Sequence, residues 1–287
     1  MTGDNMGFSV LMSIYEKEKP EYFREAIDSV LAQTMPPDEI VLVEDGPLPL
    51  ELDCVIEEYH KKHSILKLVQ LKENVKLGKA LAEGLRYCSC EFVARMDTDD
   101  IAVKDRFEKQ YNYMQEHGNV SVVGGSICEF GERGGEVRIK KMPLSHEEIR
   151  EYAKYRNPLN HMTVMFRKED VLEAGGYEHF PFLEDYDLWC RLLANRKVLN
   201  NLPDVLVNAR CGDGLYGRRG GWKYFTRYCK LRKKQRGLGL LNWLEYCISI
   251  VLTFGVTVPG NRIRKVIYRY VLRRNDNKLQ NIEKRPF

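Results

Sequence analysis

The sequence predicts an α/β fold in which a mostly parallel, doubly wound sheet is flanked by helices. Helical patterns with one apolar face separate four segments of strand length: the continuous apolar run 8–14, the buried strand 40–46, which ends in carboxylates and glycine, and the strands expected at 66–71 and 91–96. Strands without polar alternation are typical of parallel sheets that helices cover on both faces. A length of 287 residues suits one large domain, or one domain with an appendage.

Each further element has a local signature. Pro20 opens a helical pattern after the first strand, and other helices are expected around 51–62, 77–87 and 104–117. Beyond residue 120 the regularity weakens, and we expect strands at 120–127 and 162–166, turns at 131–136 and 175–177, and a helix in 183–195. The apolar residues expected in the core of this half are Val171, Leu172, Leu188, Trp189, Leu192 and Leu193.

Charge is unevenly distributed along the chain. Residues 212–274 contain fifteen Lys or Arg and two acids, whereas the rest of the chain is mildly acidic. Such a basic region is typical of proteins that bind anionic lipid, nucleic acid or a phosphorylated partner. The change in charge predicts a boundary near residue 215, between a body at 1–215 and a basic amphipathic helical region at 216–287.

The basic region surrounds an apolar segment, 238–259, which Asn242 and Glu245 interrupt. Its uncharged part, 246–258, is shorter than the roughly 20 residues that a membrane-spanning helix needs. With its basic and aromatic flanks, the segment favours a helix lying on an anionic membrane surface. The alternatives are a helix packed on the body and a transmembrane helix.

The eight cysteines show no paired ladder, and only Cys88 and Cys90 lie close together, as C-x-C. That spacing is typical of neither a zinc site nor a redox motif. No signal-peptide pattern precedes the first apolar run. These observations predict reduced thiols in a cytoplasmic protein.

Three carboxylates, Asp97, Asp99 and Asp100, follow the fourth expected strand in "ARMDTDDIAV". Because strand side chains alternate, Asp97 and Asp99 would share one face and could hold a hard cation, Mg²⁺ or Mn²⁺. In the alternative, Asp99 or Asp100 caps the helix expected around 104–117. One cap accounts for one aspartate, so we assign Asp97 and Asp99 to a metal and nucleotide site. Asp100 is expected to cap or orient the next segment.

Polar residues also follow the second and third predicted strands. Asp45 lies where it could hydrogen-bond a base or a ribose. Asn74, Gly78 and Lys79 lie at a helix start, where backbone N–H groups and a lysine favour phosphate, although Gly78 could equally be a turn residue. The chain lacks G-x-G-x-x-G and G-x-x-x-x-G-K-[ST], which argues against dinucleotide enzymes and P-loop NTPases.

A further acidic pair, Glu184 and Asp185, opens an apolar-faced helix in "FLEDYDLWCRL". Such a pair can cap the helix and interact with its dipole. Alternatively, one member can act as a general base that takes a proton from an attacking hydroxyl. Local spacing leaves both roles open.

Four ordered segments resemble the family 2 glycosyltransferases, which are inverting enzymes with a GT-A fold. The resemblance covers residues 8–210, and the segments are "SVLMSIYEKEKPEYFREAIDSVLAQTMPPDEIVLVEDGP", "NVKLGKALAEGL", "ARMDTDDIAVKDRFEKQ" and "GGYEHFPFLEDYDLWCRLL". Within the family, the chain is most similar to enzymes that build capsular, exopolysaccharide or O-antigen repeat units on lipid carriers. The resemblance implies transfer from a nucleotide sugar, a UDP-hexose, to an undecaprenyl-diphosphate-linked saccharide at the inner face of the plasma membrane.

The resemblance also implies roles for single residues. Asp185 would be the catalytic base, Glu184 would orient it, and Asp99 would be the principal ligand of Mn²⁺ or Mg²⁺. His161, in "NPLNHMTVMF", would lie near the acceptor or the diphosphate. The residues that would bind the nucleotide sugar are Tyr15, Glu16, Asp45, Asn74, Lys79 and Asp97, with Asp97 at the ribose or the metal.

The sequence departs from the family pattern in two places. Glu44 and Pro47 stand where the commoner pattern has Asp and Ser, which concerns the nucleotide contacts. No Q-x-x-R-W motif follows residue 210, which argues against a processive polymerase. An alternative within the same class is a polyprenyl-phosphate glycosyltransferase.

Two other classes of protein compete with this interpretation. An aspartate-based phosphohydrolase would need D-x-D-x-[TV], but Ile101 stands at the fifth position. A nucleic-acid- or membrane-binding protein without catalysis could use the basic tail, whose aromatic residues can stack on bases. That interpretation leaves the carboxylates unexplained, so no nucleic-acid partner is expected.

Overall fold

The computed structural model describes residues 7–131, 137–211 and 220–258. The chain divides into two compact units, residues 1–211 and 212–287, and each is described here by itself. The basic segment 262–274 and most of the turn expected at 131–136 lie outside the described residues.

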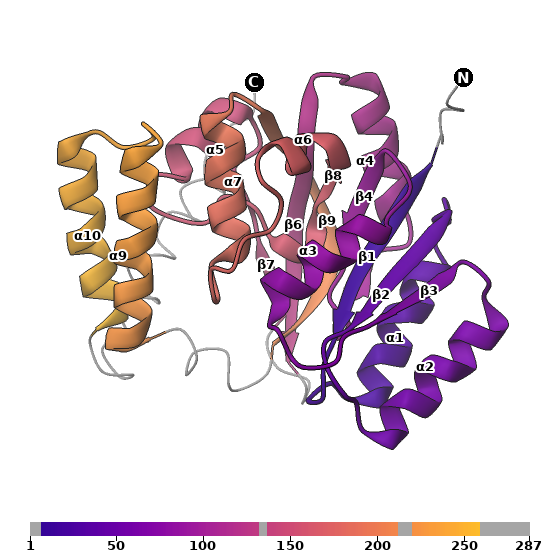
Figure 1. Cartoon of the computed structure of the whole chain (residues 1–287). Helices are drawn as coiled ribbons and strands as arrows, with labels where there is room; N and C mark the ends of the chain where they lie inside the picture. Colours follow the sequence, from indigo (N-terminus) through magenta and orange to yellow (C-terminus); the bar gives the residue numbers. More distant parts are fainter. Residues whose placement is uncertain (1–6, 132–136, 212–219, 259–287) are drawn as a thin grey trace. The chain divides into compact units, whose positions relative to one another are not determined.

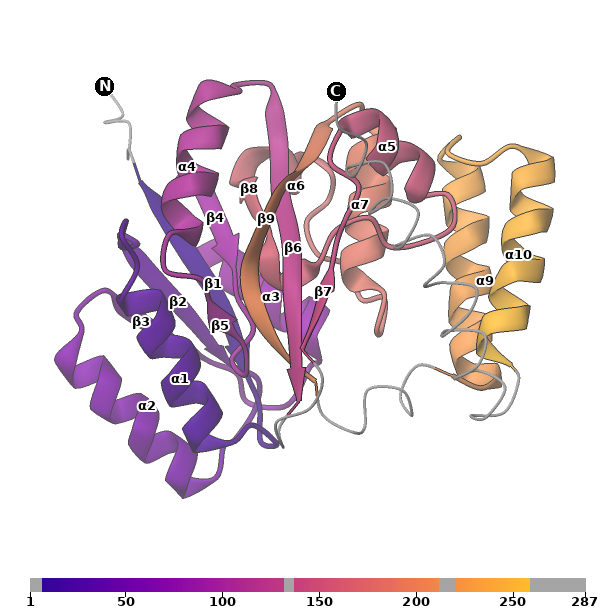
Figure 2. The same cartoon turned by 180° about the vertical axis from the view of Figure 1, so that it is seen from behind.

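The first unit contains a mixed sheet whose first half is the predicted parallel α/β structure (Figure 1). Its four parallel strands are β1 (Phe8–Ile14), β2 (Glu39–Glu44), β3 (Leu66–Gln70) and β4 (Phe92–Arg95), in the order β3-β2-β1-β4. The helices between and after them are α1 (Pro20–Leu31), α2 (Leu50–Lys62), α3 (Leu77–Tyr87) and α4 (Arg106–Glu116). Figures 1 and 2 show α3 on one face of the sheet and α1, α2 and α4 on the other. The predicted α/β fold class is therefore confirmed.

The second half of the sheet mixes strand directions. Beyond β4 the order continues β8-β6-β9-β5, with β7 paired to β6. The strands are β5 (Ile101–Ala102), β6 (Val120–Gly131), β7 (Arg138–Lys140), β8 (Met165–Arg167) and β9 (Val198–Cys211). Only the β6–β9 pair is parallel among the described pairings here, and β8 runs antiparallel to both β4 and β6.

One expectation for this half was wrong in its bounds, and one strand was missed. The strand expected at 162–166 begins at Met165, because His161–Thr163 form a short 3₁₀ helix, η1. The long strand β9 was not predicted, since polar residues recur along it and Pro203 lies in its middle. Proline usually argues against a strand because it cannot donate to the ladder.

Three helices complete the first unit: α5 (His146–Tyr152), α6 (Lys168–Glu173) and α7 (Glu184–Ala194). Five of the six predicted core residues are buried, but Leu172 is 48% exposed. Helix α6 is two turns long and buries Val171, so the next residue faces away from the core.

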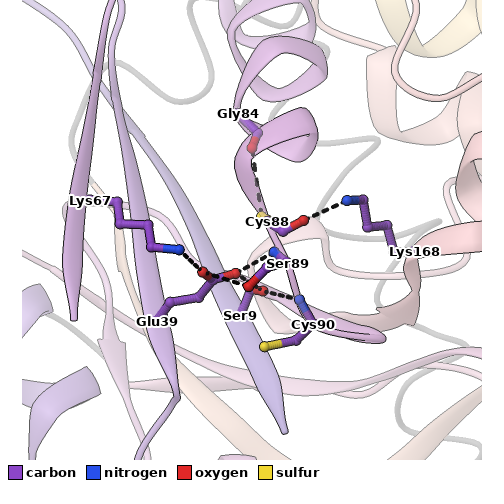
Figure 3. Close-up of polar contacts among 8 residues, drawn as sticks. All are labelled: Ser9, Glu39, Lys67, Gly84, Cys88, Ser89, Cys90 and Lys168. Carbon is purple, nitrogen blue, oxygen red and sulfur yellow. Dashed lines mark hydrogen bonds and ion pairs between the residues drawn. The ribbon is translucent and has the colours of Figure 1, made fainter. Parts of the chain in front are cut away.

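Figure 3 shows a buried polar cluster at the amino ends of the first strands. Glu39 accepts hydrogen bonds from Ser9 Oγ at 2.5 Å, from the N–H and Oγ of Ser89, and from Lys67 Nζ. Burial alone would raise the pKa of Glu39, but these donors hold it at about 2. The loop that supplies Ser89 also carries the neighbouring cysteines, and burial raises the pKa of Cys88 to about 12. Glu39 thus fixes the α3–β4 connection to the start of the sheet.

The second unit contains two packed helices, α9 (Trp222–Gly237) and α10 (Trp243–Thr257). The two polar residues that interrupt the apolar segment form the capping box of α10: Asn242 Oδ1 accepts from Glu245 N at 2.9 Å, and Glu245 Oε2 accepts from Asn242 N at 2.8 Å. Within the described ranges, no helix combines the length and apolarity needed to cross a bilayer.

Candidate functional site

The candidate site lies where the parallel strands end. The carboxyl ends of parallel strands meet at one edge of a sheet, which is where ligands of such folds bind. Here the segments after β1, β2, β3 and β4 carry the predicted site residues, and the amino end of α7 brings in the acidic pair.

The three aspartates after β4 converge on one point. Asp97, Asp99 and Asp100 each place a carboxylate oxygen within 4.8 Å of the others. They lie in a turn, so the turn, and not strand alternation, brings them together. Burial and then the charge of Asp97 raise the pKa of Asp99 to about 7 and that of Asp100 well above its ordinary value. The described residues therefore do not fully offset the cost of ionising all three carboxylates together.

This oxygen cluster fits a hard divalent cation. Mg²⁺ and Mn²⁺ prefer a few carboxylate oxygens, with water and phosphate at the other positions. Asp100 Oδ2 is buried and has no hydrogen-bond partner among the described residues. A buried acceptor beside two crowded carboxylates is the arrangement that a cation would complete.

Neither Asp99 nor Asp100 caps helix α4, so the capping alternative is wrong, and so is the capping part of the expectation for Asp100. Helix α4 begins after Asp105, whose side chain makes no capping bond. Asp100 Oδ1 instead accepts the backbone N–H of Arg210 at 2.7 Å, so it orients the end of β9. That contact could not be foreseen once β9 was missed.

On the nucleotide side, Asp45 organises the loop after β3. Its Oδ1 accepts from Val75 N at 2.7 Å and its Oδ2 from Lys76 N at 3.1 Å. Burial raises the pKa of Asp45, and these two bonds oppose the rise. Gly46 has φ +91°, and a Cβ there would lie 2.7 Å from Asn74 N. Glycine therefore allows the two loops to touch.

The remaining predicted nucleotide ligands surround this junction. Asn74 is in the loop that Asp45 holds, and Lys79 is in the first turn of α3. Tyr15 and Glu16 follow the end of β1. All four side chains are exposed, as a ligand-binding surface requires.

Glu44 faces a different environment from its neighbour Asp45. It lines a cavity of about 500 Å³ together with Asp53 and Glu57 of α2. Gln70 Nε2 donates to Glu44 Oε2 at 3.1 Å, while burial raises the pKa of Glu44. Residue 44, where the sequence departs from the family pattern, thus lines this cavity, while the side chain of Asp45 holds residues 75 and 76 of the loop after β3.

The acidic pair begins α7 and touches α3. A Cβ on Gly78 would lie 2.9 Å from the Glu178 carbonyl oxygen and 3.2 Å from Glu184 Cβ. Gly78 is in the first turn of α3, and its lack of a side chain permits close packing against Glu178 and Glu184. Burial and then the charge of Asp185 raise the pKa of Glu184 to about 7.

Both carboxylate oxygens of Asp185 accept hydrogen bonds. Its Oδ2 accepts from Asn157 Nδ2 at 2.6 Å and its Oδ1 from Tyr186 N at 2.7 Å. The N-cap of α7 is Leu183, so both acids lie in the first turn, where the helix dipole favours carboxylates. Favourable dipole interaction and general-base chemistry are therefore compatible at this position.

His161 has a protein partner. Its Nε2 lies 2.9 Å from Tyr177 Oη, and its ring packs edge-on against Trp189 with centroids 6.1 Å apart. Burial, followed by the charge of Arg95, lowers the pKa of His161 well below its ordinary value. The imidazole is therefore neutral at pH 7, and its contact with the acceptor or diphosphate stays a prediction.

Comparison with known proteins identifies the family. The family described as Glycosyl transferase family 2 matches residues 9–176. The chain belongs to it. Among curated relatives of this glycosyltransferase, the amylovoran biosynthesis glycosyltransferase AmsE of Erwinia amylovora is 44% identical, covering 91% of this chain and 97% of that protein.

A second relative is the UDP-Gal:alpha-D-GlcNAc-diphosphoundecaprenol beta-1,3-galactosyltransferase of Escherichia coli. It is 34% identical over 96% of this chain and 99% of its own length. Among solved structures, S. aureus TarS in complex with UDP-GlcNAc superposes with a TM-score of 0.64, 19% identity and coverage of 87% of this chain and 72% of that one. This likeness confirms the predicted GT-A type of fold.

Three side chains of the glycosyltransferase site were not identified from the sequence. Arg95 pairs through Nη2 with Asp97 Oδ1, while its buried Nε and Nη1 have no partner in the described part of the chain. Glu18 accepts from Thr98 Oγ1 at 2.8 Å, beside the aspartates. Arg210 donates from Nε to the Asp99 carbonyl at 3.0 Å. Of the three, only Arg95 had a feature in the sequence that could have identified it, because it is a charged residue at the end of a mostly apolar strand.

Proposed function

We propose that this glycosyltransferase moves a hexose from a UDP-sugar to a lipid-linked saccharide, with inversion, in the synthesis of a cell-surface polysaccharide. The observation that carries the proposal is the position of two acidic clusters at the carboxyl edge of the parallel strands: the aspartates of Asp97–Asp100, and the pair Glu184–Asp185. The relatives named above support a lipid-linked acceptor, an undecaprenyl diphosphate saccharide, and a polysaccharide product.

Donor binding would use both sides of the edge. Asp99 and Asp97 would hold Mn²⁺ or Mg²⁺, which, when bound, neutralises the leaving diphosphate as a Lewis acid. Asp45 would contact the nucleoside and keep the loop after β3 in place through Val75 and Lys76. The exposed side chains Tyr15, Glu16, Asn74 and Lys79 would complete the nucleotide site.

Acceptor activation is assigned to Asp185. Its carboxylate would take the proton of the acceptor hydroxyl as that oxygen forms its bond to the anomeric carbon, and the nucleoside diphosphate leaves from the opposite face. One displacement inverts the configuration at that carbon. Glu184 would orient Asp185, and His161 would lie near the acceptor or the diphosphate.

The C-terminal unit is proposed to hold the enzyme on the inner face of the plasma membrane, next to a lipid-linked acceptor. Helix α9 exposes Lys223, Lys230, Lys233 and Arg236. Helix α10 exposes Trp243, Leu244, Val251 and Leu252. Basic and apolar side chains together are typical of helices on anionic membrane surfaces. Flotation with anionic liposomes should recover the protein and weaken with salt, whereas equal recovery on neutral vesicles would contradict the electrostatic part.

The transfer reaction itself is tested with the purified chain, Mn²⁺, a panel of UDP-hexoses and undecaprenyl-diphosphate-linked saccharides. Asp185→Asn should lower turnover by ~10²–10⁴-fold, the usual contribution of a general base. Product from the active pair should show the inverted anomeric configuration. Near-normal turnover in Asp185→Asn would remove the base assignment, and a retained configuration would remove the single displacement.

A further inference from the structure

A side-chain amide from outside helix α7 holds the proposed base. Asn157 Nδ2 donates to Asp185 Oδ2 at 2.6 Å, across 28 residues of sequence. We infer that Asn157 is a positioning residue that fixes the Asp185 carboxylate for proton abstraction. The inference rests on the proposed role of Asp185.

The orientation of this amide is set by its surroundings. An ionised carboxylate only accepts hydrogen bonds, and Asp185 Oδ2 lies 2.6 Å from the Asn157 amide nitrogen, so the donating end of the amide faces it. At the accepting end, Asn157 Oδ1 lies 3.5 Å from Leu159 N, at the long limit of a hydrogen bond. Asn157 therefore presents a donor, and not an acceptor, to the carboxylate.

The segment that carries Asn157 is anchored to the sheet. Asn160 Nδ2 donates to the Gly125 carbonyl at 2.9 Å, and Asn201 Nδ2 donates to the Pro158 carbonyl at 3.2 Å. Both anchors are buried and lie on β6 and β9. A side chain supported in this way holds its partner more precisely than one on a free loop.

The consequence for the reaction is a fixed carboxylate plane. Tyr186 N holds Oδ1 and Asn157 holds Oδ2, so rotation of the carboxylate would break both bonds. A donor to an ionised carboxylate also favours the ionised form, which is the form that accepts a proton. Titratable or charged groups that act on this part of the site include Glu184, Tyr177 and Arg95.

The experiment compares Asn157→Ala and Asn157→Asp with the wild type in the full chain. It measures kcat and the KM for a UDP-hexose with Mn²⁺, and records the pH profile of kcat. Asn200→Ala is the matched control, because Asn200 Nδ2 makes a bond of equal length, 2.6 Å, to Tyr113 Oη away from the acidic groups. The profiles are repeated in the Glu184→Gln background, since Glu184 would titrate in the same range.

We expect kcat to fall ~10–100-fold in Asn157→Ala, the usual effect of losing a residue that orients a reacting group. The KM for the donor should stay within about twofold, and the acidic limb of the profile should move to higher pH. Asn157→Asp should be worse than Asn157→Ala, because it places two like charges together.

Three results would overturn the inference in distinguishable ways. Unchanged kcat and pH profile in Asn157→Ala, with an inactive Asp185→Asn, would reject the positioning role and leave the proposed function standing. Near-normal turnover in Asp185→Asn would reject the base itself. An equal fall in kcat and loss of folded protein in Asn157→Ala and Asn200→Ala would assign Asn157 a structural role.

Discussion

The pKa values of carboxyl groups are shifted in opposite directions at the two ends of the parallel sheet. At the amino end, Glu39 meets donors from Ser9, Ser89 and Lys67, and its pKa is held at about 2 (Figure 3). At the carboxyl end, burial raises the pKa of both Asp99 and Glu184 to about 7. At the amino end, hydrogen-bond donors and Lys67 therefore stabilise the ionised carboxylate. At the carboxyl end, the surrounding residues stabilise the ionised form much less.

This difference separates structure from function within one fold. A buried charge that the protein itself pairs contributes to a defined native state. Carboxylates that the protein crowds together reduce stability, and they are characteristic of sites where a ligand supplies the missing charge. Removing a carboxylate from the amino end is thus expected to lower stability, whereas removing one from the carboxyl end is expected to lower activity.

The largest effect is expected from Asp99→Asn. This change removes one proposed metal ligand at constant size, so transfer should fall at least ~100-fold, the equivalent of several kcal/mol of transition-state stabilisation. Metal-free stability should be unchanged or higher, because a repulsive charge is lost. Rates with Mn²⁺ and urea unfolding in EDTA measure the two effects, and wild-type transfer by the variant would break the comparison.

The opposite result is expected for Glu39→Gln. The change removes the charge that Lys67 and the serine donors surround, so the free energy of unfolding should fall by about 2–4 kcal/mol. Turnover per folded molecule should be unchanged, since the residue is at the far end of the strands. Urea unfolding and active-site-normalised rates test this, and a large loss of kcat without loss of stability would contradict it.

The two ends should also respond to pH with opposite sign. The folded state raises the pKa of Glu184 from 4.5 to about 7, so its contribution to stability is full below about pH 4.5 and is lost as pH rises toward 7. Glu184→Gln should gain about 1–3 kcal/mol over the wild type at pH 8 and almost nothing at pH 4.5.

For Glu39 the folded pKa is lowered from 4.5 to about 2, so its contribution is present above pH 4.5 and is lost as pH falls toward 2. Urea unfolding of both variants at pH 3, 4.5 and 8, without metal, measures these dependences. The same slope for both residues would show that the ends do not differ in their electrostatics.

A smaller effect is expected from Gly78→Ala. The added methyl group would meet the Glu178 carbonyl at 2.9 Å, so it should cost about 1–3 kcal/mol or displace the acidic pair. Gly118→Ala is the control, because a Cβ there meets nothing within 4 Å. Thermal unfolding and kcat measure the outcome. Equal Tm and kcat in the two variants would contradict a requirement for close packing between α3 and α7.

The first half of the fold could be predicted because its strands are short, mostly apolar segments and they alternate with helices that have one apolar face. The parallel strands β1 to β4 and the helices α1 to α4 follow those patterns closely. Strand β9 could not be predicted, since its partner strand decides its structure and Pro203 obscures its pattern. Because Arg210 is on β9, its contacts with Asp99 and Asp100 could not be predicted either.

The residue types of the candidate site were visible in the sequence, but their partners were not. Asp97, Asp99 and the Glu184–Asp185 pair stood out as clustered acids. The amide of Asn157 did not, because it lies in a segment without periodicity and reaches Asp185 only through the tertiary fold. Gly78 was visible as a glycine, yet only the packing of α3 on α7 gives its reason.

The most direct test of the account is ligand-dependent stability of three proteins: wild type, Asp99→Asn and Glu39→Gln. Each is heated with EDTA, with Mn²⁺, and with Mn²⁺ plus each UDP-hexose. A donor that binds the folded state at 100 times its Kd adds about 2.7 kcal/mol of stability. We predict an Mn²⁺-dependent rise in Tm for the wild type and for Glu39→Gln, and none for Asp99→Asn. An equal rise in Asp99→Asn, or no rise in the wild type with any UDP-hexose, would contradict the assignment of the carboxyl end as the metal and donor site.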